Sequence, residues 1–549
     1  MKNRLLPLLA VVVVALATIA GGYYGSSRPA HVTEADSDLT EQLAADFKEA
    51  ISEIQESYAG KADLEVLGKN SIQGMLHQLD PHSAFFTKAE FDEVQTEQSS
   101  RIYGIGVTIA KRYDRVYILS ATPGAPGHRA GLRYGDAIVA IDKQNVDDWT
   151  SQQVMHRVRG EKGDPVELTV ERAGTPNPIT VRVRRDEVKL PSVRNSFMTA
   201  QGGTGYIALT GGFSSKTDEE LSESLGQLKL DGMRQLVLDL RNNPGGLLDE
   251  AIKVSTRFLA PGEKILEVRG RDEESAAHTY EVPKDNEPET IPMVVLVDRQ
   301  TASASEIVAG ALQDHDRALI VGENTFGKGL VQGVFRLWGG TGLVLTTAKY
   351  YTPTGRSIQR SYANVSFYDY YLNRSEDQGS AANSQQHGDA LRTDLGRTVY
   401  GGGGITPDVE IKAPPISSRL FYGIFDFVRQ LVAGQLQGLR AYRIGECQYK
   451  TKITPEDINR FPVTDDLMAA YRQYISNRPQ FNLSEERLSA SVNYIRSQMR
   501  REIMTAAYGP EAGDQVYLTD DPQFRKAIES LDRARVLAEN ANRQRGSRQ

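Results

Sequence analysis

The stretch MVVLVDRQTASASEI, from Met293 to Ile307, decides the fold class because it joins a continuous apolar run to a turn of small residues and then to a helical pattern. Five consecutive apolar residues, Met293 to Val297, are typical of a strand that is covered on both faces. Similar runs occur on either side, at Leu236 to Leu240 and at Ala318 to Val321. Helical patterns that begin near Leu247 and Ser303 separate the runs, so the sequence predicts an α/β domain with crossover helices.

Ser303 lies at the start of the second of these helices, followed by Ala304 and, three positions on, by Glu306. Ser and Glu at this spacing form a capping box, which would explain both residues without any catalysis. The same place suits a nucleophile, because the N–H groups at a helix start can stabilise a developing oxyanion. The motif alone leaves both interpretations open.

Lys328 lies between two glycines after another buried run, where a long charged side chain has no evident role at a surface. If it points inward, burial favours the neutral amine. A neutral lysine can take a proton from serine and return it to a leaving amine, so Ser303 and Lys328 suffice for acyl transfer. Gln332, four residues on, is placed to orient the amine, although a strand glutamine is more often a polar surface residue.

A nucleotide-binding loop is the competing interpretation of the same segment. Residues 322–329 nearly match the pattern G-x-x-x-x-G-K-[ST] and follow an apolar strand. However, Gly329 stands where the hydroxyl that binds Mg²⁺ belongs, and residues 330–337 have the pattern of a strand rather than of the helix that holds phosphate. The sequence therefore disfavours an NTPase. None of the eight histidines has the spacing of metal ligands, and no metal site or cofactor is predicted.

A third motif, Leu238 to Gly246, ends a buried strand with the turn Asn-Asn-Pro-Gly-Gly. Exposed backbone N–H groups of such a turn can complete an oxyanion hole. Taken alone, the motif is better explained as an ordinary turn.

These three motifs, in this order, resemble the carboxyl-terminal processing proteases, serine peptidases with a Ser-Lys dyad that include the tail-specific proteases. The resemblance covers roughly residues 39–411 and includes Leu79-Asp80-Pro81. It implies a crotonase-like α/β core of sheet and helix layers. The resemblance implies that Ser303 is the nucleophile, that Lys328 is the general base and that Gln332 positions it. It also implies that two backbone N–H groups stabilise the oxyanion. One belongs to Ala304 and the other to the Pro-Gly-Gly turn, where Gly245 is preferred to Gly246. One departure is the strand Gly205 to Leu209, which lacks an arginine that family members often carry there.

The same resemblance identifies residues 98–188 as an inserted, mostly β PDZ domain. Gly104, Ile105, Gly106 and Val107 match its carboxylate-binding loop, and Ser151 to Val158 matches its groove helix. Such a module implies that substrates are selected by their carboxyl termini. The alternative is a non-catalytic PDZ scaffold or adaptor with a protease-like core.

Composition and the amino-terminal segment limit the number of domains, the partners and the location of the protein. The 549 residues suggest three to four domains, and 64 Lys and Arg against 71 Asp and Glu give a net charge of −7, which disfavours nucleic acid as a partner. The single cysteine, Cys447, cannot form an internal disulfide. Lys2 and Arg4 precede a long uncharged stretch, so residues 1–27 are predicted to be an export signal or, by a slight preference, a retained membrane anchor.

The sequence thus predicts an exported, membrane-tethered serine endopeptidase at the periplasmic or extracytoplasmic face of the cell membrane, which cleaves near exposed carboxyl termini. The predicted regions are the amino-terminal segment 1–27, a helical cap at 37–97, the PDZ domain at 98–188, the protease core at 189–414 and a helical region at 415–549. The amphipathic helices of the last region fit a homodimer and fit intramolecular packing equally well. An adaptor protein is a further possible partner.

Overall fold

The computed structural model describes residues 34–92, 101–271, 278–363, 365–366, 370–371, 388–414 and 417–548. Residues 1–27, with the predicted signal or anchor, lie outside these ranges. Among the helices of the described residues, none combines the length and the hydropathy that crossing a membrane requires.

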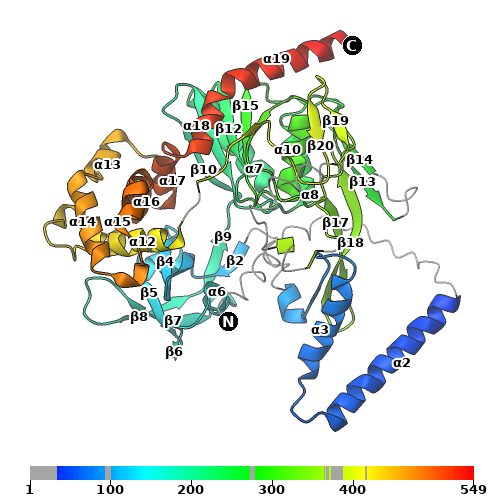
Figure 1. The fold of residues 1–549 in the computed structure, drawn as a ribbon, viewed down its shortest axis with the longest axis horizontal. Coiled ribbons are helices and arrows are strands. Elements are labelled where there is room, and N and C mark those ends of the chain that lie inside the picture. The colour runs from blue at the N-terminus through cyan, green and yellow to red at the C-terminus, as the bar shows by residue number, and fades with distance from the viewer. Residues whose placement is uncertain are drawn as a thin grey trace.

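The amino-terminal part consists of two helices and a short strand. They are α2 (Glu34–Ser57), α3 (Leu64–His77) and β1 (Ala84–Phe86). Asp63 caps α3, because its carboxylate accepts hydrogen bonds from the N–H groups of Glu65 and Val66. α2 stands away from the rest of the molecule, whereas β1 joins the body by pairing with a strand near residue 343 (Figure 1).

The second part is a β-rich unit whose core is built from alternating apolar residues of its strands. Its strand order is β3-β4-β5-β7-β8, with β6 on β5 and a separate pair of β2 and β9. The elements are β2 (Arg101–Gly104), β3 (Val107–Arg112), β4 (Arg115–Ala121), α5 (Pro126–Arg129), β5 (Ala137–Ile141), β6 (Gln144–Asn145), α6 (Ser151–Val158), β7 (Pro165–Glu171), β8 (Ile179–Arg184) and β9 (Asp186–Lys189). The helix predicted at Ser151 to Val158 is confirmed as α6.

The third part holds a six-stranded sheet in the order β10-β11-β12-β15-β16-β21, parallel except for β10. Alternate residues of its central strands point to opposite faces, and both faces are buried, which confirms the predicted α/β domain. The elements are β10 (Val193–Met198), β11 (Thr204–Leu209), α7 (Thr217–Leu230), β12 (Gln235–Asp239), α8 (Leu248–Thr256), β15 (Met293–Val297), α10 (Ala304–Asp314), β16 (Leu319–Gly322) and β21 (Val409–Glu410).

A second, antiparallel sheet lies beside the first and contains the strand that follows Lys328. Its order is β1-β18-β13-β14, with β17 also paired to β18. The strands are β13 (Lys264–Gly270), β14 (His278–Glu281), β17 (Leu330–Arg336) and β18 (Gly342–Tyr351). β17 confirms the strand that the sequence predicted after Lys328.

The stretch 375–404 is rich in Ser, Asn, Gln and Gly, a composition that predicts an exposed loop, and part of that prediction is wrong. Residues 375–387 lie outside the described ranges. Further on, β19 (Ala390–Arg392) and β20 (Thr398–Tyr400) form a hairpin, and Gly401 and Gly404 are buried. The glycines allow the backbone to pack closely: a methyl group at Gly404 would lie 2.7 Å from the Thr325 hydroxyl.

The carboxyl-terminal region is helical, as predicted. Its helices are α12 (Ser418–Val432), α13 (Pro455–Arg460), α14 (Asp465–Ser476), α15 (Glu485–Ala490), α16 (Val492–Tyr508), α17 (Pro510–Leu518), α18 (Pro522–Glu529) and α19 (Leu531–Arg548), with 3₁₀ turns at Arg440–Tyr442 and Pro479–Phe481. α18 and α19 cover the face of the parallel sheet opposite α7, α8 and α10 (Figure 1).

The same helical region also packs on the β-rich unit. Phe425 of α12 contacts the rings of Tyr117 and Tyr134, with ring centroids 5.1 and 5.7 Å apart. The Tyr134 hydroxyl donates to Glu502 over 2.6 Å, and Arg133 donates to the Gly445 carbonyl over 2.7 Å. Residues 417–548 therefore bridge the β-rich unit and the α/β core.

Candidate active site

Ser303 occupies a strained turn between β15 and α10. Its backbone angles, φ 55° and ψ −118°, are unusual for a residue with a side chain. Such a conformation costs about 1–3 kcal/mol and persists only where the surroundings enforce it. Here the Ser303 N–H donates to the Glu306 carboxylate over 2.8 Å, and the neighbouring Ala302 N–H donates to the Asn243 carbonyl. The turn is thus held in place from two sides.

Lys328 is fully buried, so its amine points into the protein. Its Nζ donates to the Gln332 side-chain oxygen over 3.1 Å. Burial lowers the pKa of Lys328 well below its ordinary value, and the negative charges of Asp80 and Glu306 offset this only in part. The environment therefore favours a neutral amine, the form that can accept a proton.

Glu306 joins the segments of Ser303 and Lys328, a role that its spacing did not reveal. Its buried carboxylate accepts hydrogen bonds from the N–H groups of Ser303, Gly327 and Lys328, and from the Thr325 hydroxyl. The capping interaction expected from the sequence is only one of these four. The carboxylate also occupies the N–H groups that a nucleotide phosphate would need, which argues against the NTPase interpretation.

The backbone segments of Ser303 and Lys328 are held together by shared partners. The Tyr350 hydroxyl lies within hydrogen-bonding distance of the carbonyl oxygens of both residues. Within the part of the chain that the structure describes, no hydrogen bond links Ser303 Oγ to Lys328 Nζ. Hydrogen bonds between catalytic groups are often long or poorly aligned when no substrate is bound, so the missing bond does not argue against the pair.

The Pro-Gly-Gly turn packs directly on Ser303. Gly245 has φ +97°, and a methyl group there would lie 2.8 Å from the Ser303 Cβ, so only glycine fits. The Gly245 N–H donates to the Asn243 side chain over 2.9 Å. Gly246 and Ala304, by contrast, line the cleft beside Ser303. The N–H of Gly245, the glycine preferred from the sequence, is thus engaged by Asn243 in this conformation, whereas Gly246 borders the cleft.

The cleft itself is mainly apolar. Besides Ser303, Ala304, Gly246 and Gln332, its walls are formed by larger side chains: Leu248, Ile307, Leu330, Val331 and Tyr350. The cleft beside Ser303 is thus better suited to apolar than to charged groups.

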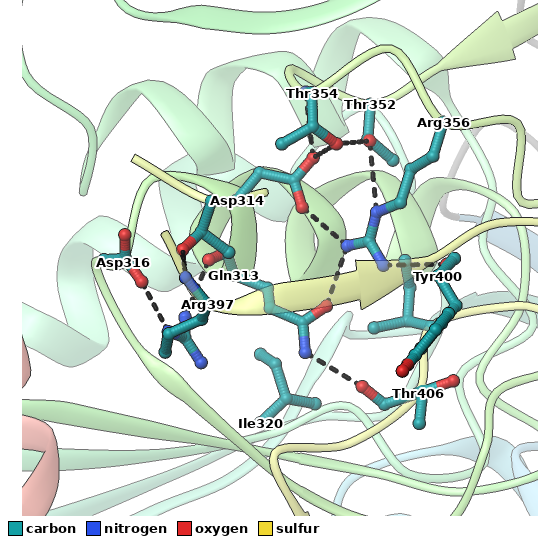
Figure 2. A network of polar contacts seen from close by, with 12 residues as sticks. Gln313, Asp314, Asp316, Ile320, Thr352, Thr354, Arg356, Arg397, Tyr400 and Thr406 are labelled. Carbon is teal, nitrogen blue, oxygen red and sulfur yellow. Dashed lines mark hydrogen bonds and ion pairs between the residues drawn. The ribbon is translucent and has the colours of Figure 1, made fainter. Parts of the chain in front are cut away.

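The far end of α10 is fixed by a buried polar network (Figure 2). Arg356 and Asp314 form an ion pair of 2.6 Å, and both side chains are almost completely buried. Arg356 also donates to Gln313, and Thr354 donates to Asp314 from both its N–H and its hydroxyl. The helix that carries the Ser303 turn is therefore anchored at both ends.

One group of potential metal ligands occurs among the described residues: Glu263, His315 and Asp394. His315 already bonds to Asp394 through Nδ1 and to the Lys264 carbonyl through Nε2. The Arg545 guanidinium lies 2.6 Å from Glu263, so a metal ion there would meet a positive charge. We assign no metal to this cluster.

The predicted carboxylate-binding loop connects β2 and β3. Gly104 ends β2, Ile105 is buried in the core, Gly106 has φ +68°, and Val107 begins β3. A methyl group at Gly106 would lie 2.3 Å from the Ala125 Cβ, which explains the glycine. β3 is the terminal strand in its sheet order and α6 contacts it, as expected of a strand edge that receives an extended peptide.

Comparison with known proteins gives two family matches, Peptidase family S41 at residues 203–365 and PDZ domain at residues 104–183. The chain is 35% identical over 332 residues to the carboxy-terminal-processing protease of Bartonella bacilliformis, covering 60% of this chain and 75% of that protein. It is 33% identical over 307 residues to a probable CtpA-like serine protease of Staphylococcus aureus strain COL, covering 56% and 60%. A solved photosystem II D1 C-terminal processing protease aligns over 75% of this chain and 94% of its own, with 27% identity and a TM-score of 0.37.

Proposed function

Because this chain belongs to the carboxy-terminal-processing proteases of peptidase family S41, we propose that Ser303 is the nucleophile and Lys328 the general base of its serine-type peptidase activity. One observation carries the proposal. The amine of Lys328 is fully buried and bonds to Gln332, and Glu306 bonds to the backbone of both Lys328 and the strained turn at Ser303. The matches to peptidases argue against the non-catalytic scaffold.

The mechanism follows from these groups. Ser303 Oγ attacks the substrate carbonyl carbon while neutral Lys328 takes the hydroxyl proton. The N–H groups of Ala304 and of the Pro-Gly-Gly turn, where Gly246 borders the cleft, stabilise the oxyanion of the tetrahedral intermediate. When the C–N bond breaks, the Lys328 ammonium gives its proton to the leaving amine. Water then attacks the ester, with Lys328 again accepting the proton and Ser303 recovering it.

A covalent probe tests the nucleophile. We expect an alkyl fluorophosphonate to phosphonylate Ser303 with loss of fluoride, and peptide mapping by mass spectrometry to find the label there. Ser305 is the internal control, because its hydroxyl is buried and donates to the Asn243 carbonyl. Label on Ser305, or label that persists in Ser303→Ala, would contradict the assignment.

The PDZ domain supports a second proposal, that substrates bind by their carboxyl termini to the loop of Gly104, Ile105, Gly106 and Val107 and extend along β3. We expect an unfolded substrate with an amidated carboxyl terminus to be cleaved with a KM raised about tenfold or more, since it lacks the charge that the loop N–H groups would bind. Cleavage rates of the free-acid and amidated forms measure this. Equal KM values would remove the role of the PDZ domain.

Location and partners rest on the sequence alone. We propose that residues 1–27 direct export and tether the enzyme to the extracytoplasmic face of the cell membrane. The crotonase-like layering, the homodimer, the adaptor protein and the domain boundaries given above also stay predictions.

A further inference from the structure

A four-residue turn connects the amino-terminal helices to the residues around Lys328, the proposed general base. Asp80, Pro81, His82 and Ser83 lie between α3 and β1, and all four are buried. The Asp80 carboxylate accepts hydrogen bonds from the N–H groups of His82 and Ser83, at 2.7 and 2.8 Å, and from the Ser83 hydroxyl at 2.7 Å. These three bonds fix the direction of the His82 carbonyl.

That carbonyl contacts Gln332, the residue that holds Lys328. Gln332 Nε2 donates to the His82 oxygen over 2.7 Å, and Gln332 Oε1 accepts from Lys328 Nζ over 3.1 Å. A carbonyl oxygen can only accept, so its presence decides which end of the amide faces Lys328. Without it, the amide could turn and present its own N–H₂ group to the amine.

The His82 side chain anchors the turn from the other side. Its Nε2 lies 2.9 Å from the Tyr370 hydroxyl and its Nδ1 lies 3.0 Å from the Tyr371 hydroxyl. The Tyr371 hydroxyl donates to the Pro81 carbonyl, so it must accept from Nδ1–H. Nε2 is then free of a proton and accepts from Tyr370, while Gln359 donates to the Tyr370 oxygen. One neutral tautomer of His82 satisfies every bond.

The charges around His82 agree with this tautomer. Burial lowers the pKa of His82 well below its ordinary value, and the positive charges of Lys328 and Arg360 lower it further. Arg360 stacks on the rings of Tyr370 and Phe326, 4.2 and 4.8 Å from their centroids, and closes the cluster. The imidazole therefore acts as a rigid neutral link between the turn and the two tyrosines.

We propose that Asp80 and His82 are positioning residues for the general base: they fix the His82 carbonyl, which orients the Gln332 amide so that its oxygen holds the Lys328 amine. This inference rests on the proposed function of Lys328. The inference goes beyond that function because it assigns the turn before β1, in the amino-terminal part of the chain, a role in orienting the general base.

The test is a double-mutant cycle in the full chain. His82→Phe keeps a ring of similar size but removes both hydrogen bonds, and Gln332→Ala removes the residue through which His82 acts. We expect each single change to lower kcat about 10- to 100-fold with little change in KM. Because both act through one contact, adding His82→Phe to Gln332→Ala should lower kcat by a further factor of about two or less.

The pH profile provides a readout that a purely structural role would not move. Gln332 Oε1 binds the ammonium form of Lys328 more strongly than the amine, so its loss favours deprotonation. In the plot of kcat against pH, the rise on the acidic side should therefore move to lower pH in both His82→Phe and Gln332→Ala. His278→Phe, the same change at an exposed histidine of β14, should match the wild type. If His82→Phe does not fold, Tyr370→Phe removes one of the two anchoring hydroxyls and should shift the rise on the acidic side in the same direction.

Additive effects in the cycle, or a rise on the acidic side that stays in place or moves to higher pH, would overturn the inference. Failure of the dyad itself is recognised separately, because Lys328→Arg would then remain active. If Lys328→Arg is inactive and His82→Phe behaves like His278→Phe, only the positioning role is wrong.

Discussion

Lys328→Arg should abolish peptide cleavage, with a fall in kcat of about 10²- to 10⁴-fold, the usual contribution of a general base. Burial lowers the pKa of Lys328 well below its ordinary value, which favours the neutral amine. A guanidinium keeps its proton under all conditions in which the protein is folded, so it cannot accept one from Ser303. The measurement is the initial rate of cleavage of an unfolded protein that ends in apolar residues, over a range of pH.

Lys349→Arg is the matched control. Lys349 lies on β18 of the same sheet and is exposed, so the same substitution there should leave the rate unchanged. Circular dichroism of both variants checks that they are folded. A folded Lys328→Arg enzyme with the activity of Lys349→Arg would show that another group is the base.

Asp314→Ala should lower the free energy of unfolding by about 3–5 kcal/mol, the cost of leaving a buried charge without its partner. Asp314 and Arg356 are 0% and 1% exposed, and the network of Figure 2 offers Arg356 no other carboxylate. The change also removes the acceptor of two bonds from Thr354. Since this network fixes the end of α10, activity should fall as stability falls.

Urea unfolding followed by fluorescence measures this effect, taken as the shift of the transition of the α/β core. Adding Arg356→Met to Asp314→Ala should recover part of the loss, because it removes the stranded charge. Glu539→Ala breaks the exposed pair with Arg535 and should cost less than about 1 kcal/mol. A loss in Asp314→Ala no larger than in Glu539→Ala would contradict the prediction.

The sequence predicted those features that depend on short spacings. The apolar runs near 236, 293 and 319 became the central strands, and the turn of Ser303 and the inward Lys328 follow from them. Contacts between distant segments could not be predicted in this way. Glu306 shows the difference: its spacing from Ser303 indicated a cap, but nothing local showed that Gly327 and Lys328 would donate to the same carboxylate.

The carboxyl-terminal helices show the same limit on a larger scale. Their amphipathic patterns predicted helices but left open whether these pack within the chain or against a second copy. In the structure, Phe524 and Ala534 pack on the far face of the parallel sheet, and Phe425 packs on the PDZ domain. Which surface an apolar stripe covers depends on the whole topology, so a periodicity within one helix cannot indicate it.

The pairing of β1 with β18 sets the order in which parts of the chain can fold. Ala84 to Phe86 pair with Gly342 to Val344, and the His82 carbonyl meets a glutamine 250 positions later in the chain. Contacts this far apart in sequence form slowly, after local structure. During synthesis the ribosome must add 250 further residues after His82 has emerged before the contact with Gln332 can exist. A nascent or truncated chain that stops short of β17 therefore contains Ser303 but lacks Gln332, which holds the Lys328 amine. On the proposed mechanism, cleavage activity can arise only after the antiparallel sheet has formed.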